Sequence, residues 1–150
     1  MQGFGQELTT FILVRHAEKV VDGTKDPALT KEGEARAAKL LTVLAKTNVS
    51  AIYSTNYQRT LLTVTPLALN KGVSIKNYDW KDPKAMLGKM LTEHSGGTVV
   101  ISGHSNTTPV LANILLGEEV FSQFNDDDYG NLLIITSTAI GGGKLVHLTY

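Results

Sequence analysis

Two histidines in this sequence each follow a short apolar segment that has the character of a buried strand. The segment Phe11–Val14 leads into Arg15 and His16, and the segment Thr98–Ser102 leads toward His104. An imidazole can attack phosphorus and hold the phosphoryl group covalently, which divides one difficult displacement into two easier steps. An adjacent arginine can contact two phosphate oxygens at once with its planar guanidinium group. These residue types therefore indicate phosphoryl transfer.

A second arginine follows a third apolar segment. Val49–Tyr53 has the pattern of a buried strand, and the helix predicted after it carries Arg59 in its first turn. Ligands of parallel sheets bind just beyond the carboxyl ends of the strands, and the amides at helix N-termini favour anions. We therefore expect Arg59 to join Arg15 and the two histidines around one phosphate-sized anion.

Strands and helices alternate over most of the chain. The first predicted helix runs from its cap at Thr30 to about Ala45, and the second begins at Thr55 or Asn56 and is expected to kink at Pro66. The third runs from Asp82 to about Glu93. The fourth begins at Asn106–Thr108 and ends at Leu116, where Gly117 terminates it. The remaining strands are predicted over residues 73–78, 98–102, 132–136 and 145–149, the last two joined by the glycines 141–143 in a hairpin. The pattern predicts a three-layer α/β/α sandwich with a mostly parallel central sheet and an antiparallel end.

Composition excludes several classes of function. The chain has 150 residues, which predicts a single domain over residues 1–150, and it contains no cysteine, so disulfides, zinc–thiolate sites and cysteine nucleophiles are excluded. Fourteen Lys and Arg balance fourteen Asp and Glu, which argues against nucleic acid or a membrane surface as partner. No apolar run approaches the roughly 20 residues of a membrane span. Residues 1–10 lack signal-peptide character, so the default expectation is a cytoplasmic protein, or an exported one if a preceding leader was removed.

Four motifs resemble those of one protein family. Phe11–Glu18 resembles the opening motif of the histidine phosphatase superfamily, also called the phosphoglycerate mutase-like family. Asp26–Gly33 resembles the entry to that family's first helix, Tyr53–Thr60 resembles the segment with its second arginine, and Gly103–Asn106 resembles its second-histidine segment. Together the motifs cover roughly residues 10–117 in family order.

The resemblance implies a role for each matching residue. It makes His16 the nucleophile and places Arg15, Arg59 and His104 in the phosphate pocket, with the amide of Ser105 as a further candidate contact. It also implies the phosphoglycerate mutase-like fold and a hydrolase that needs neither a metal nor another cofactor. The intermediate would be a covalent phosphohistidine on His16.

The proton donor to the leaving group is less defined. The family's usual donor is a carboxylate shortly after the third strand, and Asp79 occupies that place. The sequence departs from the mutase pattern here, because it has Asp in place of the usual Glu and lacks the Gly-rich segment that follows it. Asp82 is an alternative donor, and Glu18 could instead orient a group in the pocket. Short members of the family that act on phosphohistidine proteins can lack the acid altogether.

Other polar residues lack a chemical context. His94 and His147 follow no matching motif, so they are expected to be surface or packing residues. Asp126–Asp128 lacks the spacing of an EF-hand calcium loop and is expected to be a solvated loop. Ser105 and Asn106 suit helix capping better than catalysis.

The sequence thus predicts a phosphatase whose substrate is a small-molecule phosphate ester or a phosphorylated protein. The alternatives are a phosphohistidine protein phosphatase, a phosphoglycerate mutase and a catalytically idle phosphate-binding domain. A mutase is disfavoured because the chain between Arg59 and His104 leaves little room for the insertions that exclude water from the site. Specificity is expected from three loops, Val20–Leu29, Lys76–Lys89 and Glu118–Asn131, and the sequence carries no signal for an oligomeric state.

Overall fold

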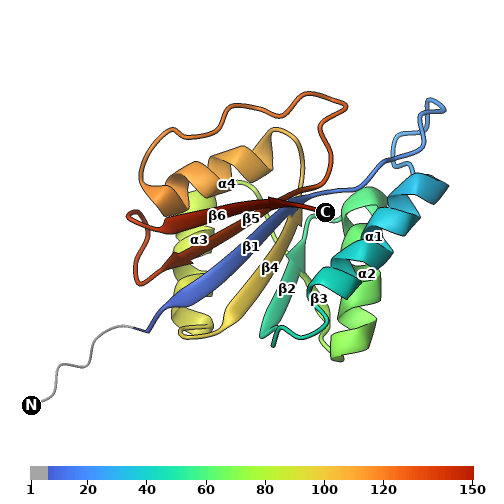
Figure 1. Ribbon diagram of the computed structural model, residues 1–150. Coiled ribbons are helices and arrows are strands. Elements are labelled where there is room, and N and C mark those ends of the chain that lie inside the picture. The colour runs from blue at the N-terminus through green and yellow to red at the C-terminus, as the bar shows by residue number, and fades with distance from the viewer. Residues whose placement is uncertain (1–6) are drawn as a thin grey trace, which may run out of the picture.

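The computed structural model describes residues 7–150 (Figure 1). Residues 1–6, which belong to the segment without signal-peptide character, lie outside the described residues. The helices and strands in chain order are β1 (Thr9–Arg15), α1 (Lys31–Val43), β2 (Ala51–Ser54), α2 (Gln58–Lys71), β3 (Ile75–Asn77), α3 (Pro83–Glu93), β4 (Thr98–Gly103), α4 (Thr107–Leu116), β5 (Asn131–Ser137) and β6 (Lys144–Thr149). No helix within residues 7–150 is both long and apolar enough to cross a membrane.

The strands form one six-stranded sheet in the order β3-β2-β4-β1-β5-β6. The first four of these strands are parallel, β5 runs antiparallel to β1, and β6 runs antiparallel to β5. Helices α1 and α2 cover one face of the sheet, and α3 and α4 cover the other (Figure 1). The predicted three-layer sandwich, with its mostly parallel sheet and its antiparallel end, is confirmed.

The central strand β1 is buried on both faces. Phe11 and Leu13 pack into the core beneath α3 and α4, whereas Ile12 and Val14 pack into the core beneath α1 and α2. All four side chains are at most 2% exposed. A continuous apolar run, in place of alternating apolar and polar residues, is what a strand between two helical layers requires.

Most predicted helix ends are confirmed. The Thr30 side chain accepts a hydrogen bond from the Gly33 amide at the start of α1, and the Asp82 side chain accepts one from the Ala85 amide at the start of α3. Gly117 ends α4 with a left-handed φ of 79°, which glycine adopts without the steric cost of a side chain.

The predicted cap of α2 is wrong. The N-cap residue of this helix is Tyr57, which makes no side-chain cap hydrogen bond. The Thr55 hydroxyl is instead bonded to Thr60 and to His104. Pro66 lies inside α2, and the helix continues to Lys71.

Two helical glycines differ sharply in their surroundings, which gives a test of the packing between α1 and the segment after β1. A Cβ added to Gly33 would overlap the backbone carbonyl oxygen of Glu18, whereas a Cβ added to Gly88 in α3 would meet nothing within 4 Å. We expect Gly33→Ala to lower the free energy of unfolding by about 1–3 kcal/mol, since backbone cannot easily move aside.

Gly88→Ala is the matched control. It should raise the free energy of unfolding by about 0.5–1 kcal/mol, because alanine loses less backbone entropy than glycine in a helix. Urea unfolding of the two variants and the wild type measures both effects. Equal effects of the two substitutions would contradict the close approach at Gly33.

Candidate active site

The two histidines meet where β1 and β4 end. Arg15 lies opposite Gly103 in the parallel pairing of these strands, and the His16 amide donates a hydrogen bond to the Gly103 carbonyl over 2.8 Å. The ring centroids of His16 and His104 are therefore only 5.7 Å apart. Both rings line a cleft of about 440 Å³. The other residues that line it are Arg15, Lys19, Val21, Arg59, Ser105, Asn106, Asp126 and Tyr129.

The ring of His16 is held in one neutral tautomer. Its Nδ1 lies 2.8 Å from the carbonyl oxygen of Ala17. A carbonyl can only accept a hydrogen bond, so Nδ1 carries the proton and Nε2 keeps its lone pair. The pKa of His16 is lowered from 6.5 to about 3, mainly by burial. The charges of Arg15, His104 and Arg59 act in the same direction, and the hydrogen bond to Ala17 opposes them. The imidazole is therefore neutral down to strongly acidic pH.

Arg15 is held by backbone carbonyls of a distant loop. Its Nη1 donates to the carbonyl oxygen of Asn125 over 3.0 Å and to that of Asp128 over 2.9 Å. The guanidinium carbon lies 4.1 Å from the centroid of the Tyr129 ring. None of these partners carries a negative charge at the contact, so the arginine is fixed without being neutralised. Its Nε is buried and has no hydrogen-bond partner among the described residues.

Arg59 lies in the first turn of α2, and its guanidinium carbon is 4.6 Å from the centroid of the Tyr57 ring. Its Nε, too, is buried without a partner in the described part of the chain. The Thr63 hydroxyl donates to the Arg59 carbonyl over 2.7 Å and accepts a hydrogen bond from the Ala17 amide over 2.8 Å. The helix that carries Arg59 is thus tied to the residue that follows His16.

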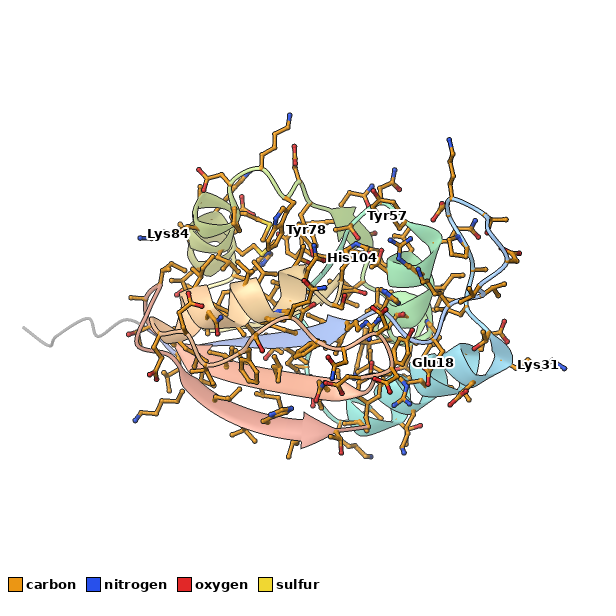
Figure 2. All side chains as sticks on the ribbon, turned by 90° about the horizontal axis from the view of Figure 1, so that it is seen from above. Glu18, Lys31, Tyr57, Tyr78, Lys84 and His104 are labelled. Carbon is orange, nitrogen blue, oxygen red and sulfur yellow. The ribbon has the colours of Figure 1, made fainter. Side chains whose placement is uncertain are left out.

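His104 lies against polar and aromatic groups. Its Nε2 is 2.8 Å from the Thr55 hydroxyl oxygen, and the Tyr57 ring meets its ring edge to face with the centroids 5.3 Å apart (Figure 2). Burial lowers the pKa of His104 from 6.5 to about 4, with the charges of Arg59, Arg15 and Lys19 acting in the same direction. Like His16, it is neutral in the free protein at neutral pH.

Asp79 is not brought to this cleft. Its carboxylate is exposed, accepts a hydrogen bond from the Lys81 amide over 3.1 Å, and lies 3.8 Å from the Lys81 ammonium group. It lines a separate cleft between β3 and α3 that also includes Lys76 and Glu93. Asp82, the alternative donor, caps α3.

Glu18 also has a structural partner. Its two carboxylate oxygens accept hydrogen bonds from Nε and Nη2 of Arg36 over 2.8 and 2.9 Å, and these bonds lower the pKa of the carboxyl group. The pair joins the segment after β1, where Glu18 lies (Figure 2), to α1, which carries Arg36. Ser105 lines the histidine cleft, and its carbonyl accepts a hydrogen bond from the Phe124 amide.

The remaining polar residues have packing contacts. His94 bonds to the Tyr53 hydroxyl over 2.8 Å, and His147 bonds to Asn131 over 2.9 Å.

Residues 7–150 contain no group of three or more His, Asp or Glu side chains that could hold a metal ion.

Sequence reasoning did not single out Lys19, Tyr129 or Asp126, which line the cleft. Asp126 and Tyr129 lie in the loop Glu118–Asn131, which was expected to contribute to specificity, but no contact of Asp126 with the cleft was predicted. Its side chain is exposed, as expected, but the hydrogen bonds from Arg15 to the neighbouring carbonyls hold that loop at the mouth of the cleft. The contact between the Thr55 hydroxyl and His104 was not predicted either, because Thr55 was considered only as one of two candidates for a helix cap.

Comparison with known proteins finds one family model that matches part of the chain and a set of structures with a similar fold. The family model for the histidine phosphatase superfamily (branch 1) matches residues 11–79. No curated protein sequence matches the chain. Solved structures match over nearly its whole length.

Mycobacterial glucosyl-3-phosphoglycerate phosphatase Rv2419c has 14% identity and a TM-score of 0.75, with 93% of this chain and 97% of that chain covered. The protein histidine phosphatase SixA, solved with tungstate, has 13% identity and a TM-score of 0.75, with 93% and 96% covered. Phosphoserine phosphatase from Entamoeba histolytica, solved with 3-phosphoglyceric acid, has 16% identity and a TM-score of 0.72, with 95% and 97% covered. At such identities the likeness shows a common fold. The family model thus covers residues 11–79, which contain three of the four motifs, and the fold of nearly the whole chain is that of these solved phosphatases.

Proposed function

We propose that residues 1–150 form a single-domain, metal-independent phosphatase that hydrolyses a phosphomonoester through a covalent phosphohistidine on His16. The observation that carries this proposal is the state of His16, whose Nε2 has a free lone pair in a cleft lined by two arginines. The buried Nε donors of Arg15 and Arg59 lack partners among residues 7–150. Buried donors of this kind are costly unless a ligand accepts their hydrogen bonds.

The reaction has two displacements at phosphorus. In the first, Nε2 of His16 forms a bond to phosphorus, and the bond from phosphorus to the leaving oxygen breaks as that oxygen takes a proton. In the second, water attacks phosphorus, the bond to Nε2 breaks, and inorganic phosphate is released. Arg15 and Arg59 stabilise the charge on the phosphoryl oxygens in both steps. A preorganised donor of this kind is commonly worth about 3–4 kcal/mol of transition-state stabilisation.

Similar structures support an oxyanion in this cleft. The SixA structure contains tungstate, and one structure of Rv2419c contains inorganic phosphate. Their names also cover two substrate classes, a phosphorylated protein and a phosphorylated small molecule. We propose the same two classes for this chain.

One observation favours a phosphohistidine protein as the alternative substrate. Asp126 is the one carboxylate among the described residues that line the histidine cleft, and its side chain is exposed. The cleft therefore offers a single exposed proton donor to the leaving group. A leaving imidazole can already carry a proton, so it depends less on a proton donor than an alkoxide does.

The first test of the proposal is the covalent intermediate. His16→Ala should lower turnover of an aryl phosphate on the order of 10³-fold or more, because the nucleophile is removed. The wild type, quenched without acid, should contain an acid-labile and alkali-stable phosphohistidine, and a chelator should leave its rate unchanged. His147→Ala, a change on β6 outside the cleft, is the matched control and should retain activity. Full activity of His16→Ala would overturn the mechanism.

The neutral state of His16 predicts how stability depends on pH. The unfolded imidazole takes up a proton below its ordinary pKa of 6.5, whereas the folded one does so only near 3. The contribution of His16 to the free energy of unfolding therefore decreases as the pH falls from about 7 to 4, because the unfolded state binds more protons than the folded state in this window.

His16→Asn removes this proton uptake, so the fall in the free energy of unfolding between pH 7 and pH 4 should be smaller in the variant than in the wild type. Urea unfolding at a series of pH values measures the difference, and titrations elsewhere in the chain cancel between the two proteins. Parallel curves would show that His16 is not held neutral by the fold.

The residue that donates a proton to the leaving group can be identified by comparing three aspartate variants. We propose Asp126 as the donor, because it lines the histidine cleft whereas Asp79 lines a different one. Asp126→Asn should slow the hydrolysis of alkyl phosphates about 10²-fold and that of aryl phosphates much less, since an aryl oxide leaves with little protonation. Asp127→Asn, the neighbouring exposed carboxylate, is the control. A selective loss on alkyl esters in Asp79→Asn, with none in Asp126→Asn, would return the role to Asp79.

A further inference from the structure

A pair of buried threonine hydroxyls lies behind His104. The Thr55 hydroxyl oxygen is 2.8 Å from Nε2 of His104 and 2.9 Å from the Thr60 hydroxyl oxygen. The Thr60 hydroxyl is also 3.0 Å from two backbone carbonyl oxygens, those of Thr55 and Tyr57. Both threonines are at most 8% exposed, so these five groups form a chain of hydrogen bonds that is shielded from solvent.

The direction of each bond in this chain follows from its two carbonyls. A carbonyl oxygen can only accept, so the proton of Thr60 is donated to one of them. Thr60 can then only accept from Thr55, and the proton of Thr55 is used in that bond. The remaining contact of Thr55 is to Nε2 of His104, where its oxygen must accept. His104 therefore carries a proton on Nε2.

This assignment is opposite to that of His16. His16 has its proton on Nδ1, where Ala17 accepts it, and its lone pair on Nε2. His104 has its proton on Nε2, so the nitrogen that remains for a ligand in the cleft is Nδ1. A neutral Nδ1 presents a lone pair, which repels a phosphate oxygen, and only a protonated Nδ1 can donate to it.

We propose that the Thr55–Thr60 pair fixes His104 with its proton on Nε2, so that His104 binds a phosphate dianion by taking up a proton from solvent at Nδ1. Thr55 is then a positioning residue, which acts through His104 and does not itself touch the substrate. The inference rests on the proposed function only to the extent that the cleft binds a phosphate-like dianion.

The charges around His104 support this exchange. Without a ligand, burial and then the charges of Arg59, Arg15 and Lys19 favour the neutral ring. A dianion in the cleft reverses this balance, because its charge favours the imidazolium form. The titratable groups that face or share the cleft with His104 are Arg15, His16, Lys19, Tyr57, Arg59, Asp126 and Tyr129.

Tungstate is a suitable probe, since it remains a dianion at neutral pH and its own protonation does not interfere. We expect calorimetry at pH 7 in buffers of different ionisation enthalpy to show uptake of about one proton per tungstate bound. In ¹⁵N NMR spectra of histidine-labelled protein, His104 should be protonated only on Nε2 when free and on both nitrogens when bound. The spectra of His16→Asn and His104→Asn assign the signals.

A matched pair of variants tests the role of Thr55. Thr55→Val keeps the shape but removes the acceptor, so tungstate affinity should fall about tenfold to hundredfold, as for the loss of a hydrogen bond to a charged group. The free ring of His104 should then populate both tautomers. Thr55→Ser restores the hydroxyl and should restore both properties, and circular dichroism verifies that each variant is folded.

The outcomes separate the inference from the function on which it rests. Tungstate binding without proton uptake by His104, or a free His104 that already carries a proton on Nδ1, would overturn the inference and leave the proposed function intact. Equal losses of tungstate affinity in Thr55→Val and Thr55→Ser, with unchanged ¹⁵N chemical shifts of His104, would show that Thr55 is only a packing residue. That result would also overturn the inference. If the wild type binds no tungstate, both the inference and the proposed phosphate site fail.

Discussion

The parallel register of β1 and β4 is the constraint from which the candidate site follows. It places Arg15 opposite Gly103, so the residues that leave the ends of the two strands, His16 and His104, emerge next to each other. Side chains alternate along a strand, and a shift of one residue would exchange the two faces of β1. Both faces are filled with apolar side chains that fit different helical layers. The packing of the core therefore sets the separation of the two imidazoles.

The positive charge of the cleft persists because its arginines are held by neutral groups. Arg15 is fixed by two carbonyl oxygens and Arg59 lies against a tyrosine ring, whereas Arg36, outside the cleft, is paired with the carboxylate of Glu18. A carboxylate partner would cancel the charge that an anion must meet. A chain with a formal net charge of zero can thus carry a locally cationic cleft, at a cost in stability that a bound anion would offset.

The parts of this structure that could be predicted are those that depend on residues close together in the sequence. The apolar run Phe11–Val14 fixed a central strand, and the capping residues Thr30 and Asp82 were visible because a cap acts on amides two or three positions away. The Asn125 and Asp128 carbonyls could not be predicted as partners of Arg15, because they lie 110 and 113 residues away and every residue has a carbonyl.

The position of Asp79 shows a second limit. Its place after β3 was correct, but the cleft that it lines is decided by the packing of α3 against the sheet edge, where Lys76 and Glu93 are its neighbours. Asp126 is the reverse case. Its loop, Glu118–Asn131, was expected near the site, but the hydrogen bonds from Arg15 to the Asn125 and Asp128 carbonyls decide that this carboxylate lines the cleft. In both cases tertiary contacts, not local sequence, decide which carboxylate lines the histidine cleft.

The two histidines also differ in how firmly the fold specifies their protons. The partner of His16 is a carbonyl, which can only accept, so the lone pair of this imidazole is fixed on Nε2 whatever the cleft contains. The partner of His104 is a hydroxyl, whose direction depends on a second hydroxyl and on the carbonyls behind it. The nucleophile proposed for His16 needs one constant state, whereas the phosphate-binding role proposed for His104 must suit both an empty and an occupied cleft. The fold supplies a rigid acceptor to the first histidine and a chain of hydroxyls to the second, which matches these different demands.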